Sequence, residues 1–399
     1  MFDSIRHEPH DEVEAAEVIR EAAGCQSPLR IEGGGTKSSA GRPVLADSVL
    51  SSVNLKGVVM YEPSELVIQA RSGTSLDEIR ALLQDNGQDL PFEPPNFYGL
   101  YGVRGRPTIG AVAAMNLSGS RRISVGAARD CLLGVRFVNG RGDIIKSGGR
   151  VMKNVTGLDL VKLMAGSWGT LGFLSEVTFK VLPSARVSKT LCLEGLSDVD
   201  GIEVLTTAMR SSYDVSGAAH IPEQDVDMPA QTLIRIEGSL ASVEVRVGRL
   251  YAALREYGSV LCLDKERSAF VWAGIRELGP LRARQDEAVW RLSVPPDRAS
   301  EVMAIIKSKL EGVRWYFDWS GGLVWVAVPS WLGSGCETIR AAVGQTSGYA
   351  TLMRASEHVR RDIPVFQELS PALMAITRRL KNAFDPAGIL NPHRMYDWI

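Results

Sequence analysis

The stretch Arg30-Ile31-Glu32-Gly33-Gly34-Gly35-Thr36-Lys37-Ser38 is the most informative part of this sequence. Its consecutive glycines can adopt positive φ and approach a ligand closely, because no Cβ atom stands in the way. Successive N–H groups of such a loop can converge on the oxygens of a pyrophosphate. Leu29 and Ile31 predict a short strand that ends at this loop. A plain surface turn would have a similar composition, so the interpretation depends on the rest of the chain.

Two common phosphate-binding motifs do not fit the spacing. A Walker loop has glycine before its lysine, whereas Thr36 precedes Lys37 here. A dinucleotide-binding fingerprint reads Gly-x-Gly-x-x-Gly, but Gly166, Gly169 and Gly172 stand three residues apart. The sequence therefore predicts neither a P-loop NTPase nor a Rossmann dehydrogenase.

A second glycine-containing stretch runs from Pro107 to Asp130. Residues 107–110 (Pro-Thr-Ile-Gly) predict a loop that leads into a short helix. The small and apolar residues 111–115 can pack closely under a flat ring, and 116–119 end this run with hydrogen-bonding groups and a glycine. The two stretches together predict a site for a long, phosphate-bearing cofactor.

Hydrophobic periodicity and turn residues divide the chain at about Pro183. Before this point we expect strands at 58–61, 66–71, 132–138, 143–147 and 170–182. We expect helices at 13–23, at 159–165 and from 76 onward, the last of them capped by Ser75, and a polar link at 153–157. After it we expect strands at 191–194, 233–237, 260–263, 289–293 and 323–328, with helices at 199–211, 242–257, 298–310 and 336–343. This alternation predicts a ferredoxin-like α+β cap. A helix from Ser370 to about Phe384 is expected to return to the first domain.

Composition excludes several classes of protein. The formal net charge of −1 over 399 residues gives no reason to expect a nucleic acid partner. No apolar run approaches the ~20 residues of a membrane helix, and the start does not resemble a signal peptide. We therefore expect a cytoplasmic protein that meets a membrane only peripherally, if at all. The basic pairs Arg121-Arg122 and Arg360-Arg361 are expected on solvated faces.

The five cysteines are scattered, and no two form a Cys-x-x-Cys pair. This pattern argues against a zinc or iron–sulfur site in the chain, so no metal ligands are predicted. An odd number of cysteines in a cytoplasmic protein indicates reduced thiols.

The chain resembles the FAD-binding domain of the vanillyl-alcohol-oxidase (PCMH) type of flavoproteins. That resemblance rests on the glycine loop 33–37, the Thr-Ile-Gly-Ala segment 108–111 and the Gly-Thr-Leu-Gly strand start 169–172. The C-terminal run 381–392 is similar to the closing segment of the lactate and glycolate oxidase branch. Within that branch, the chain looks like the family of FAD-binding E subunits of bacterial glycolate oxidase complexes.

The resemblance implies an α+β fold: a two-subdomain PCMH-type FAD-binding domain at 1–184, a ferredoxin-like cap at 185–350 and a returning segment at 351–399. It implies FAD as the cofactor, bound without a covalent link because the loop region 36–39 holds neither histidine nor cysteine. The cofactor-binding residues implied are Gly33, Gly34, Gly35, Thr36, Lys37, Pro107, Thr108, Ile109, Gly110, Ala114, Ser118, Gly119, Gly126, Asp130, Gly172 and Leu174. Asp130 has a helix cap as its alternative role, and Asn391 either approaches the flavin or forms the turn before Pro392.

No catalytic residue can be assigned. Oxidation of a 2-hydroxy acid needs a base for the hydroxyl proton and a cation for the carboxylate. Histidine is more often structural than catalytic, and the family's His-x-Gly-Asp-Gly-Asn segment is missing. The aromatic stretch 315–322 is expected in the cap core or on a partner surface. Arg235 and Arg354 either bind a carboxylate or pair with Glu237 and Glu357.

Three functions remain open. The first is an FAD-binding subunit that takes part in glycolate (2-hydroxy acid) oxidation, with a sister FAD-linked catalytic subunit and an iron–sulfur subunit as partners. The second is a non-catalytic structural subunit of that complex. The third is a free-standing oxidase with another substrate.

Overall fold

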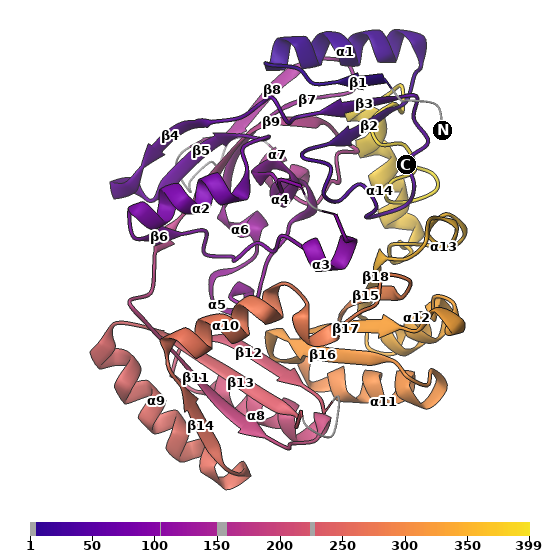
Figure 1. Ribbon diagram of the computed structural model, residues 1–399. Coiled ribbons are helices and arrows are strands. Elements are labelled where there is room, and N and C mark those ends of the chain that lie inside the picture. The colour runs from indigo at the N-terminus through magenta and orange to yellow at the C-terminus, as the bar shows by residue number, and fades with distance from the viewer. Residues whose placement is uncertain (1–4, 104, 150–157, 224–227) are drawn as a thin grey trace. The chain divides into compact units, whose positions relative to one another are not determined.

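The computed structural model describes residues 5–103, 105–149, 158–223 and 228–399. The chain forms two compact units. The first contains 1–118, 126–184 and 368–399, and the second contains 119–125 and 185–367. Figure 1 labels their elements. The expected link at 153–157 lies outside the described residues.

A small parallel sheet opens the first unit. Its strands β1 (Ile5–His7), β3 (Ser48–Ser51) and β2 (Leu29–Glu32) lie in the order β1-β3-β2. Helix α1 (Glu12–Cys25) begins after Asp11, whose carboxylate accepts the N–H groups of Val13 and Glu14. Its buried face packs on the sheet in a core of Ala15, Ala16, Ile19, Ala22, Leu29, Leu50, Leu55, Val138, Phe173, Ile389 and Leu390.

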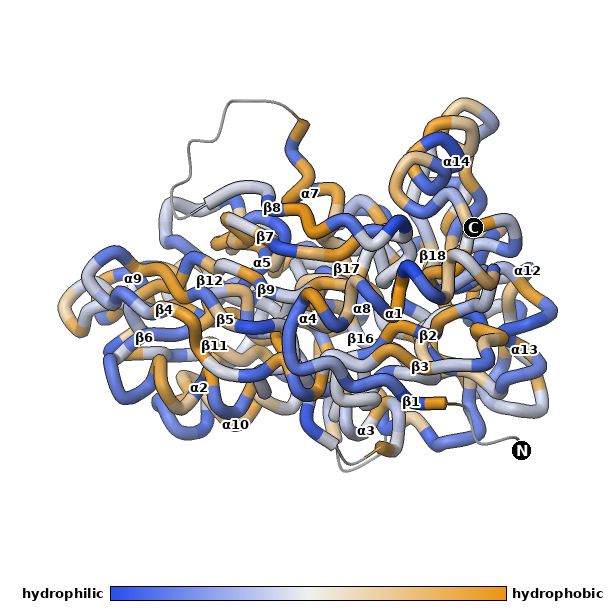
Figure 2. The backbone as a smooth tube through the Cα atoms, turned by 90° about the horizontal axis from the view of Figure 1, so that it is seen from above, coloured by the Kyte–Doolittle hydropathy of each residue, from blue (hydrophilic) through white to orange (hydrophobic). Residues whose placement is uncertain are grey.

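A five-stranded antiparallel sheet forms the second layer of this unit, in the order β4-β5-β9-β7-β8. The strands are β4 (Val58–Glu62), β5 (Val67–Arg71), β9 (Phe173–Lys180), β7 (Leu132–Val138) and β8 (Ile144–Gly148). The other helices of this unit are α2 (Leu76–Asp85), α3 (Tyr98–Tyr101), α4 (Ile109–Met115), α6 (Ala128–Cys131) and α7 (Leu160–Met164). A separate pair of short strands is formed by β6 (Gln88–Asp89) and β10 (Leu182–Pro183). The apolar residues of α7 stand out in Figure 2, and Val161 and Met164 are buried.

The C-terminal segment completes the first unit. Helix α14 (Pro371–Phe384) lies where the sequence predicts a helix, and Ser370 caps it. Beyond it, Leu390 bridges Leu29 of β2 in parallel, and Ile389 and Leu390 enter the core. The tail therefore extends the small sheet at the strand that leads into the glycine loop.

One eight-stranded antiparallel sheet dominates the second unit, in the order β14-β11-β13-β12-β16-β17-β15-β18. The strands are β11 (Val187–Glu194), β12 (Val215–Ile221), β13 (Gln231–Gly238), β14 (Val260–Leu263), β15 (Ala288–Ser293), β16 (Arg314–Asp318), β17 (Leu323–Val328) and β18 (Tyr349–Arg354). The helices are α5 (Arg122–Val125), α8 (Asp198–Arg210), α9 (Leu240–Leu254), α10 (Lys265–Arg276), α11 (Ala299–Lys309), α12 (Cys336–Gly344) and α13 (Glu357–Asp362).

This sheet consists of two ferredoxin-like halves. Each half runs strand-helix-strand-strand-helix-strand: β11-α8-β12-β13-α9-β14, then β15-α11-β16-β17-α12-β18. In both, the first and third strands are central neighbours. The halves join through β12 and β16, where His220 pairs with Phe317. The sequence indicates a ferredoxin-like cap, and the structure shows that the unit contains the motif twice.

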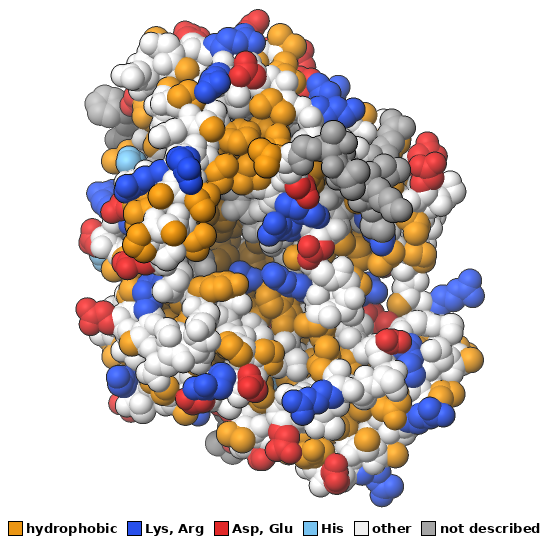
Figure 3. Space-filling view, turned by 180° about the vertical axis from the view of Figure 1, so that it is seen from behind, with side chains coloured by type: hydrophobic (Ala, Val, Ile, Leu, Met, Phe, Trp, Pro, Cys, Tyr) orange, Lys and Arg blue, Asp and Glu red, His pale blue; other side chains and the backbone are white. Residues whose placement is uncertain are grey.

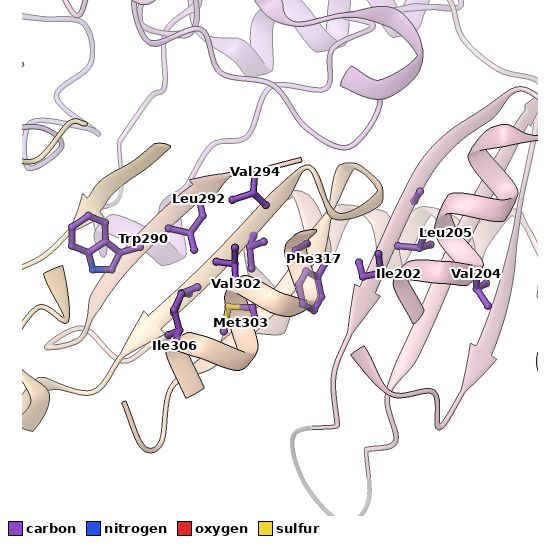
Figure 4. Packing of buried hydrophobic residues seen from close by; sticks show 14 of the residues in the cluster. Ile202, Val204, Leu205, Trp290, Leu292, Val294, Val302, Met303, Ile306 and Phe317 are labelled. Atoms are coloured by element: carbon purple, nitrogen blue, oxygen red, sulfur yellow. The ribbon is translucent and has the colours of Figure 1, made fainter. Parts of the chain in front are cut away.

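The helices α8, α9, α11 and α12 cover one face of the eight-stranded sheet (Figure 1). Figure 4 shows Val302, Met303 and Ile306 of α11 beside Trp290 and Leu292 of β15. The opposite face of the first half carries α10, whose Trp272 donates from Nε1 to Thr190 Oγ1 at 2.9 Å.

Most of the expected elements are observed. Several observed elements were not expected, among them strands β1, β3, β12, β16 and β18 and helices α3, α10 and α13. The aromatic stretch 315–322 contains most of β16, and its Tyr316, Phe317 and Trp319 are buried. Residues 351–367, expected with the returning segment, cluster with the second unit because β18 pairs with β15. The domain limits at 184 and 350 stay predictions.

Candidate cofactor site

A cavity in the first unit is enclosed by four segments of the chain. About 760 Å³ of space, part of it open to solvent, lies between the loop after β2, helix α4, the start of β9 and the C-terminal segment. It is lined by Arg30, Ile31, Glu32, Gly33, Gly34, Gly35, Thr36, Lys37, Ser38, Ser52, Ser72, Gly110, Ala111, Ala114, Met115, Trp168, Gly169, Gly172, Phe173, Leu174, Asn391 and Arg394.

The glycine loop presents backbone donors to this cavity. Within the described part of the chain, the amides of residues 33–36 donate to no acceptor. The carbonyls that follow are held instead by Arg394, which donates to Lys37 O at 3.2 Å and to Ser38 O at 3.1 Å. A run of such N–H groups forms an anion-binding nest. The loop therefore fits an anionic group such as a pyrophosphate.

Close packing explains why the loop contains glycine. A Cβ on Gly34 would lie 2.0 Å from the carbonyl oxygen of Arg106, and one on Gly33 would lie 2.2 Å from Thr108 Oγ1. Gly35 has a φ of 71°, a conformation that favours glycine. A side chain added at any of these three positions would force the loop to move.

Helix α4 forms a second wall. Thr108 caps it by accepting the N–H of Ala111 at 3.4 Å. The Gly110 N–H donates to Ser72 O at 2.8 Å, and a Cβ on Gly110 would lie 2.5 Å from the Ser72 Cβ. The helix can therefore lie directly on the loop after β5, and Gly110, Ala111 and Ala114 bring a flat, apolar surface to the cavity.

The start of β9 forms the third wall. Trp168 adopts a φ of 55°, unusual for an aromatic residue. Its N–H donates to Ala114 O at 3.0 Å, and its carbonyl accepts from Asn391 Nδ2 at 2.7 Å. A Cβ on Gly172 would lie 2.7 Å from the Phe137 ring, so glycine allows the chain to enter the sheet close to β7.

The cavity wall also contains a buried side-chain hydroxyl that lacks a partner among the described residues. The hydroxyl of Ser72 is buried and has no hydrogen-bond partner in the described structure. A buried hydroxyl without a partner is unfavourable. Together with the free loop amides and the flat wall of α4, this hydroxyl indicates that the residues present fit a ligand with hydrogen-bonding and planar parts.

The structure brings together many of the predicted cofactor residues. Those that line the cavity are Gly33, Gly34, Gly35, Thr36, Lys37, Gly110, Ala114, Gly172 and Leu174. Pro107, Thr108 and Ile109 lie at the start of α4 and are not part of the lining. For all of these, contact with a cofactor stays a prediction.

The remaining predicted residues take part in bonds within the protein. Ser118 Oγ accepts the Ala128 N–H at 2.9 Å, and Gly119 O accepts from Trp319 Nε1 at 3.0 Å. Gly126 has a φ of 84° beside Asp130, whose carboxylate accepts the Ala127 N–H at 2.8 Å and caps α6. Asp130 thus has the cap as its observed role.

Several lining residues could not have been found from local sequence. Ser52 and Ser72 lie in ordinary loops, and Arg394 lies 356 residues from the Ser38 carbonyl that it contacts. For Asn391, the proline that follows indicated a turn, and the structure shows both the turn and a place in the cavity wall. Among the described lining residues there is no histidine or cysteine, and non-covalent attachment stays a prediction.

Two of the arginines expected on solvated faces are not there, and the alternatives left open for Arg235 and Arg354 have different outcomes. Arg121 pairs with Glu237 at 3.3 Å with both side chains 13 % exposed, and Arg360 is buried, so these arginines are not on solvated faces. Arg235 pairs with Glu237 at 3.3 Å. Arg354 does not pair with Glu357 and instead donates to the carbonyls of Arg284 and Glu287.

His220 has a structural environment at the junction of the two ferredoxin-like halves. It is fully buried, with Nδ1 2.8 Å from Thr232 Oγ1 and Nε2 3.4 Å from Asp198 Oδ1. Among the described residues, no group of three or more His, Cys, Asp or Glu side chains is arranged to hold a metal ion. In the same part of the chain, no helix is long and apolar enough to cross a membrane. Figure 3 shows acidic and basic side chains interspersed on one face.

The fold and the cavity define a flavoprotein. Residues 5–148 match the model of the FAD binding domain, and residues 364–395 match that of the C-terminal domain of FAD linked oxidases. In structure, the chain is similar to 4-ethylphenol oxidase from Gulosibacter chungangensis, with a TM-score of 0.74 at 12% identity over 98% of this chain and 89% of the other.

Two relatives of known sequence narrow the family to which the chain belongs. The glycolate oxidase subunit GlcE of Escherichia coli (strain K12) is 34% identical over 382 residues, which are 95% of this chain and 96% of GlcE. The glycolate oxidase subunit GlcD of Bacillus subtilis (strain 168) is 29% identical over 57% of this chain and 46% of GlcD. The chain belongs to the vanillyl-alcohol-oxidase (PCMH) type family of FAD-linked oxidases that includes GlcE, and FAD is its cofactor.

Proposed function

We propose that this chain is the FAD-binding subunit of a glycolate oxidase complex that oxidises glycolate to glyoxylate. The observation that carries this proposal is the similarity to GlcE, which extends over nearly the whole of both chains. The partners proposed are a sister FAD-linked subunit and an iron–sulfur subunit that accepts electrons. We propose a cytoplasmic location, at most peripheral to a membrane.

The cavity residues have distinct roles in this function. The amides of residues 33–36 would hold the pyrophosphate, and the buried Lys37 would add positive charge beside it. The wall of α4 would support the planar ring, because Gly110, Ala111 and Ala114 carry almost no side chain. When bound, FAD supplies the acceptor for the hydride that leaves C2 of the 2-hydroxy acid as its hydroxyl loses a proton.

A structural subunit is the alternative, and two observations support it. The family's His-x-Gly-Asp-Gly-Asn segment is missing from this sequence, and the described residues form no cluster able to hold a metal ion. In this alternative, the chain would bind FAD or keep only the fold, and a sister subunit would oxidise the substrate.

An anaerobic titration with glycolate separates these functions. The purified chain is first assayed for released FAD, and its absorbance at the flavin band is then followed during the titration. We expect stoichiometric FAD that is reduced by glycolate, either by the chain alone or once the sister subunits are added. FAD of this chain that stays oxidised in the assembled complex would support the structural alternative, and a chain without flavin would contradict the proposal.

A further inference from the structure

Two arginines of the second unit share one tryptophan ring. The Cζ of Arg122 lies 4.5 Å from the centroid of the Trp319 ring, and the Cζ of Arg291 lies 5.1 Å from it. The indole is fixed, since its Nε1 donates to Gly119 O at 3.0 Å and the Trp319 N–H donates to Asp318 Oδ1 at 2.7 Å. Its position therefore determines where both guanidinium groups lie.

Among the described residues, no carboxylate forms an ion pair or a hydrogen bond with Arg291. The neighbouring Arg121 and Arg235 differ in this respect, because Glu237 lies 3.3 Å from each. Burial, with a contribution from the nearby charge of Arg122, lowers the pKa of Arg291 to about 10. Arg291 thus carries a positive charge that no carboxylate of the described residues pairs with.

Arg291 lies on the face of the sheet that points away from α11 and α12. Its neighbours along β15, Trp290 and Leu292, are buried in the core beneath α11 and α12. Because side chains alternate along a strand, Arg291 projects from the opposite face. Both Arg291 and Arg122 are half-buried, so a small solute can reach them while their charges remain poorly hydrated.

We propose that Arg291 and Arg122, held on Trp319, bind the carboxylate of a small 2-hydroxy or 2-oxo acid. A guanidinium group donates two parallel hydrogen bonds to a carboxylate, and an anion would offset the repulsion between two cations at one ring. The identity of the acid rests on the proposed function. The presence of an anion site rests on the three side chains alone.

Isothermal titration calorimetry with oxalate tests the site, because oxalate has the carboxylate groups but no C–H bond to oxidise. We expect the purified, flavin-containing chain to bind oxalate and Arg291→Met to bind it on the order of tenfold more weakly or worse, as for a lost charged hydrogen bond. The control is Arg298→Met, which removes an arginine that is exposed and paired with Glu301 at 2.6 Å, and should bind as the unmodified chain does.

Three outcomes would overturn the proposal: no oxalate binding, equal binding by Arg291→Met, or inorganic phosphate binding as tightly as oxalate. If Arg291→Met fails to fold, Arg291→Lys replaces it, because it keeps the charge but loses the fork and should still bind more weakly. In the assembled complex, the same variant should raise KM for glycolate more than it lowers kcat. Flavin content is measured for each variant, so that loss of FAD, which bears on the proposed function, is seen separately.

Discussion

The side chain of Asn391 is hydrogen-bonded to the backbone of Ile31, although 360 residues separate them. Its Oδ1 accepts the Ile31 N–H at 2.8 Å, and its Nδ2 donates to Trp168 O at 2.7 Å. One amide group therefore connects the strand before the glycine loop, the start of β9 and the C-terminal segment. All three contribute to the cofactor cavity.

We expect Asn391→Ala to lower FAD affinity by about tenfold, because two partly buried backbone groups lose their partner at about 1–3 kcal/mol. Asn391→Asp should be at least as harmful, since a carboxylate would face the Trp168 carbonyl where the Nδ2 donor was. The FAD content of the purified variants and its dissociation constant measure the effect. Unchanged affinity in both variants would contradict the role of this amide.

Gly34→Ala should also lose FAD. The added Cβ would lie 2.0 Å from a backbone carbonyl, and the loop would have to move away from the cavity. Gly24→Ala is the matched control, because its Cβ would meet nothing within 4 Å. We expect flavin absorbance to remain in the control and to fall severely in Gly34→Ala. Full FAD occupancy in Gly34→Ala would show that this loop does not set the position of the cofactor.

Ser72→Ala should lower FAD affinity without lowering the stability of the flavin-free protein. The Ser72 hydroxyl is buried without a partner, so its removal should leave the melting temperature of the flavin-free protein unchanged or slightly higher. If the hydroxyl contacts the cofactor, FAD affinity should fall several-fold, by about 0.5–1.5 kcal/mol. Thermal unfolding with and without FAD measures both quantities. A lower stability of the flavin-free variant would contradict this prediction.

The buried ion pair between Lys381 and Asp385 should contribute more to the free energy of unfolding than an exposed ion pair does. Lys381 Nζ lies 2.7 Å from Asp385 Oδ2, with side chains 7 % and 0 % exposed, and also donates to Thr170 O and Leu390 O. Burial lowers the pKa of Lys381, and Asp385 opposes that shift. Because its removal leaves a buried carboxylate, Lys381→Met should cost about 3–5 kcal/mol of unfolding free energy.

The matched control is the pair Glu357–Arg361, which has the same spacing along its helix but is mostly exposed. Arg361→Met should cost less than about 0.5 kcal/mol. Denaturant titration of both variants makes the comparison. Similar losses of unfolding free energy in the two variants would show that burial does not strengthen the Lys381–Asp385 pair.

The thiols should differ in reactivity. Burial raises the pKa of Cys131 to about 11 and that of Cys192 to about 12, whereas Cys25 is exposed. At pH 8 about one thousandth or less of either buried thiol is the reactive thiolate. We expect iodoacetamide to modify Cys25 first and to leave Cys131 and Cys192 intact in the folded chain, as peptide mass spectrometry would show.

The raised pKa values of Cys131 and Cys192 also predict that the folded state loses stability as the pH rises. Since the folded-state pKa values lie above the value of about 8.5 for a free thiol, the two thiols favour the folded state fully below about pH 8.5. This contribution decreases as the pH rises toward 11–12. Denaturation midpoints should therefore fall over this range, and Cys192→Ala should reduce the slope. A slope that stays the same in this variant would contradict the assignment to Cys192.

The sequence by itself determined the local elements and the chemistry of the loop. Consecutive glycines at 33–35, the capping serine Ser75 and the alternating strands each act over a few residues, so their consequences can be predicted without the fold. The spacing of glycines also excluded the two common phosphate-binding motifs. The strands β12, β16 and β18 escaped prediction because none has a simple alternation of polar and apolar residues.

Only the tertiary structure decided which distant residues share a site. The contacts of Asn391 with Ile31, of Arg394 with the glycine loop and of Arg291 with Trp319 depend on strand order and on the return of the tail. It also decided that Asp130 caps a helix and that Arg121 is paired. Burial and counter-ions come from neighbours far along the chain, and no local pattern contains that information.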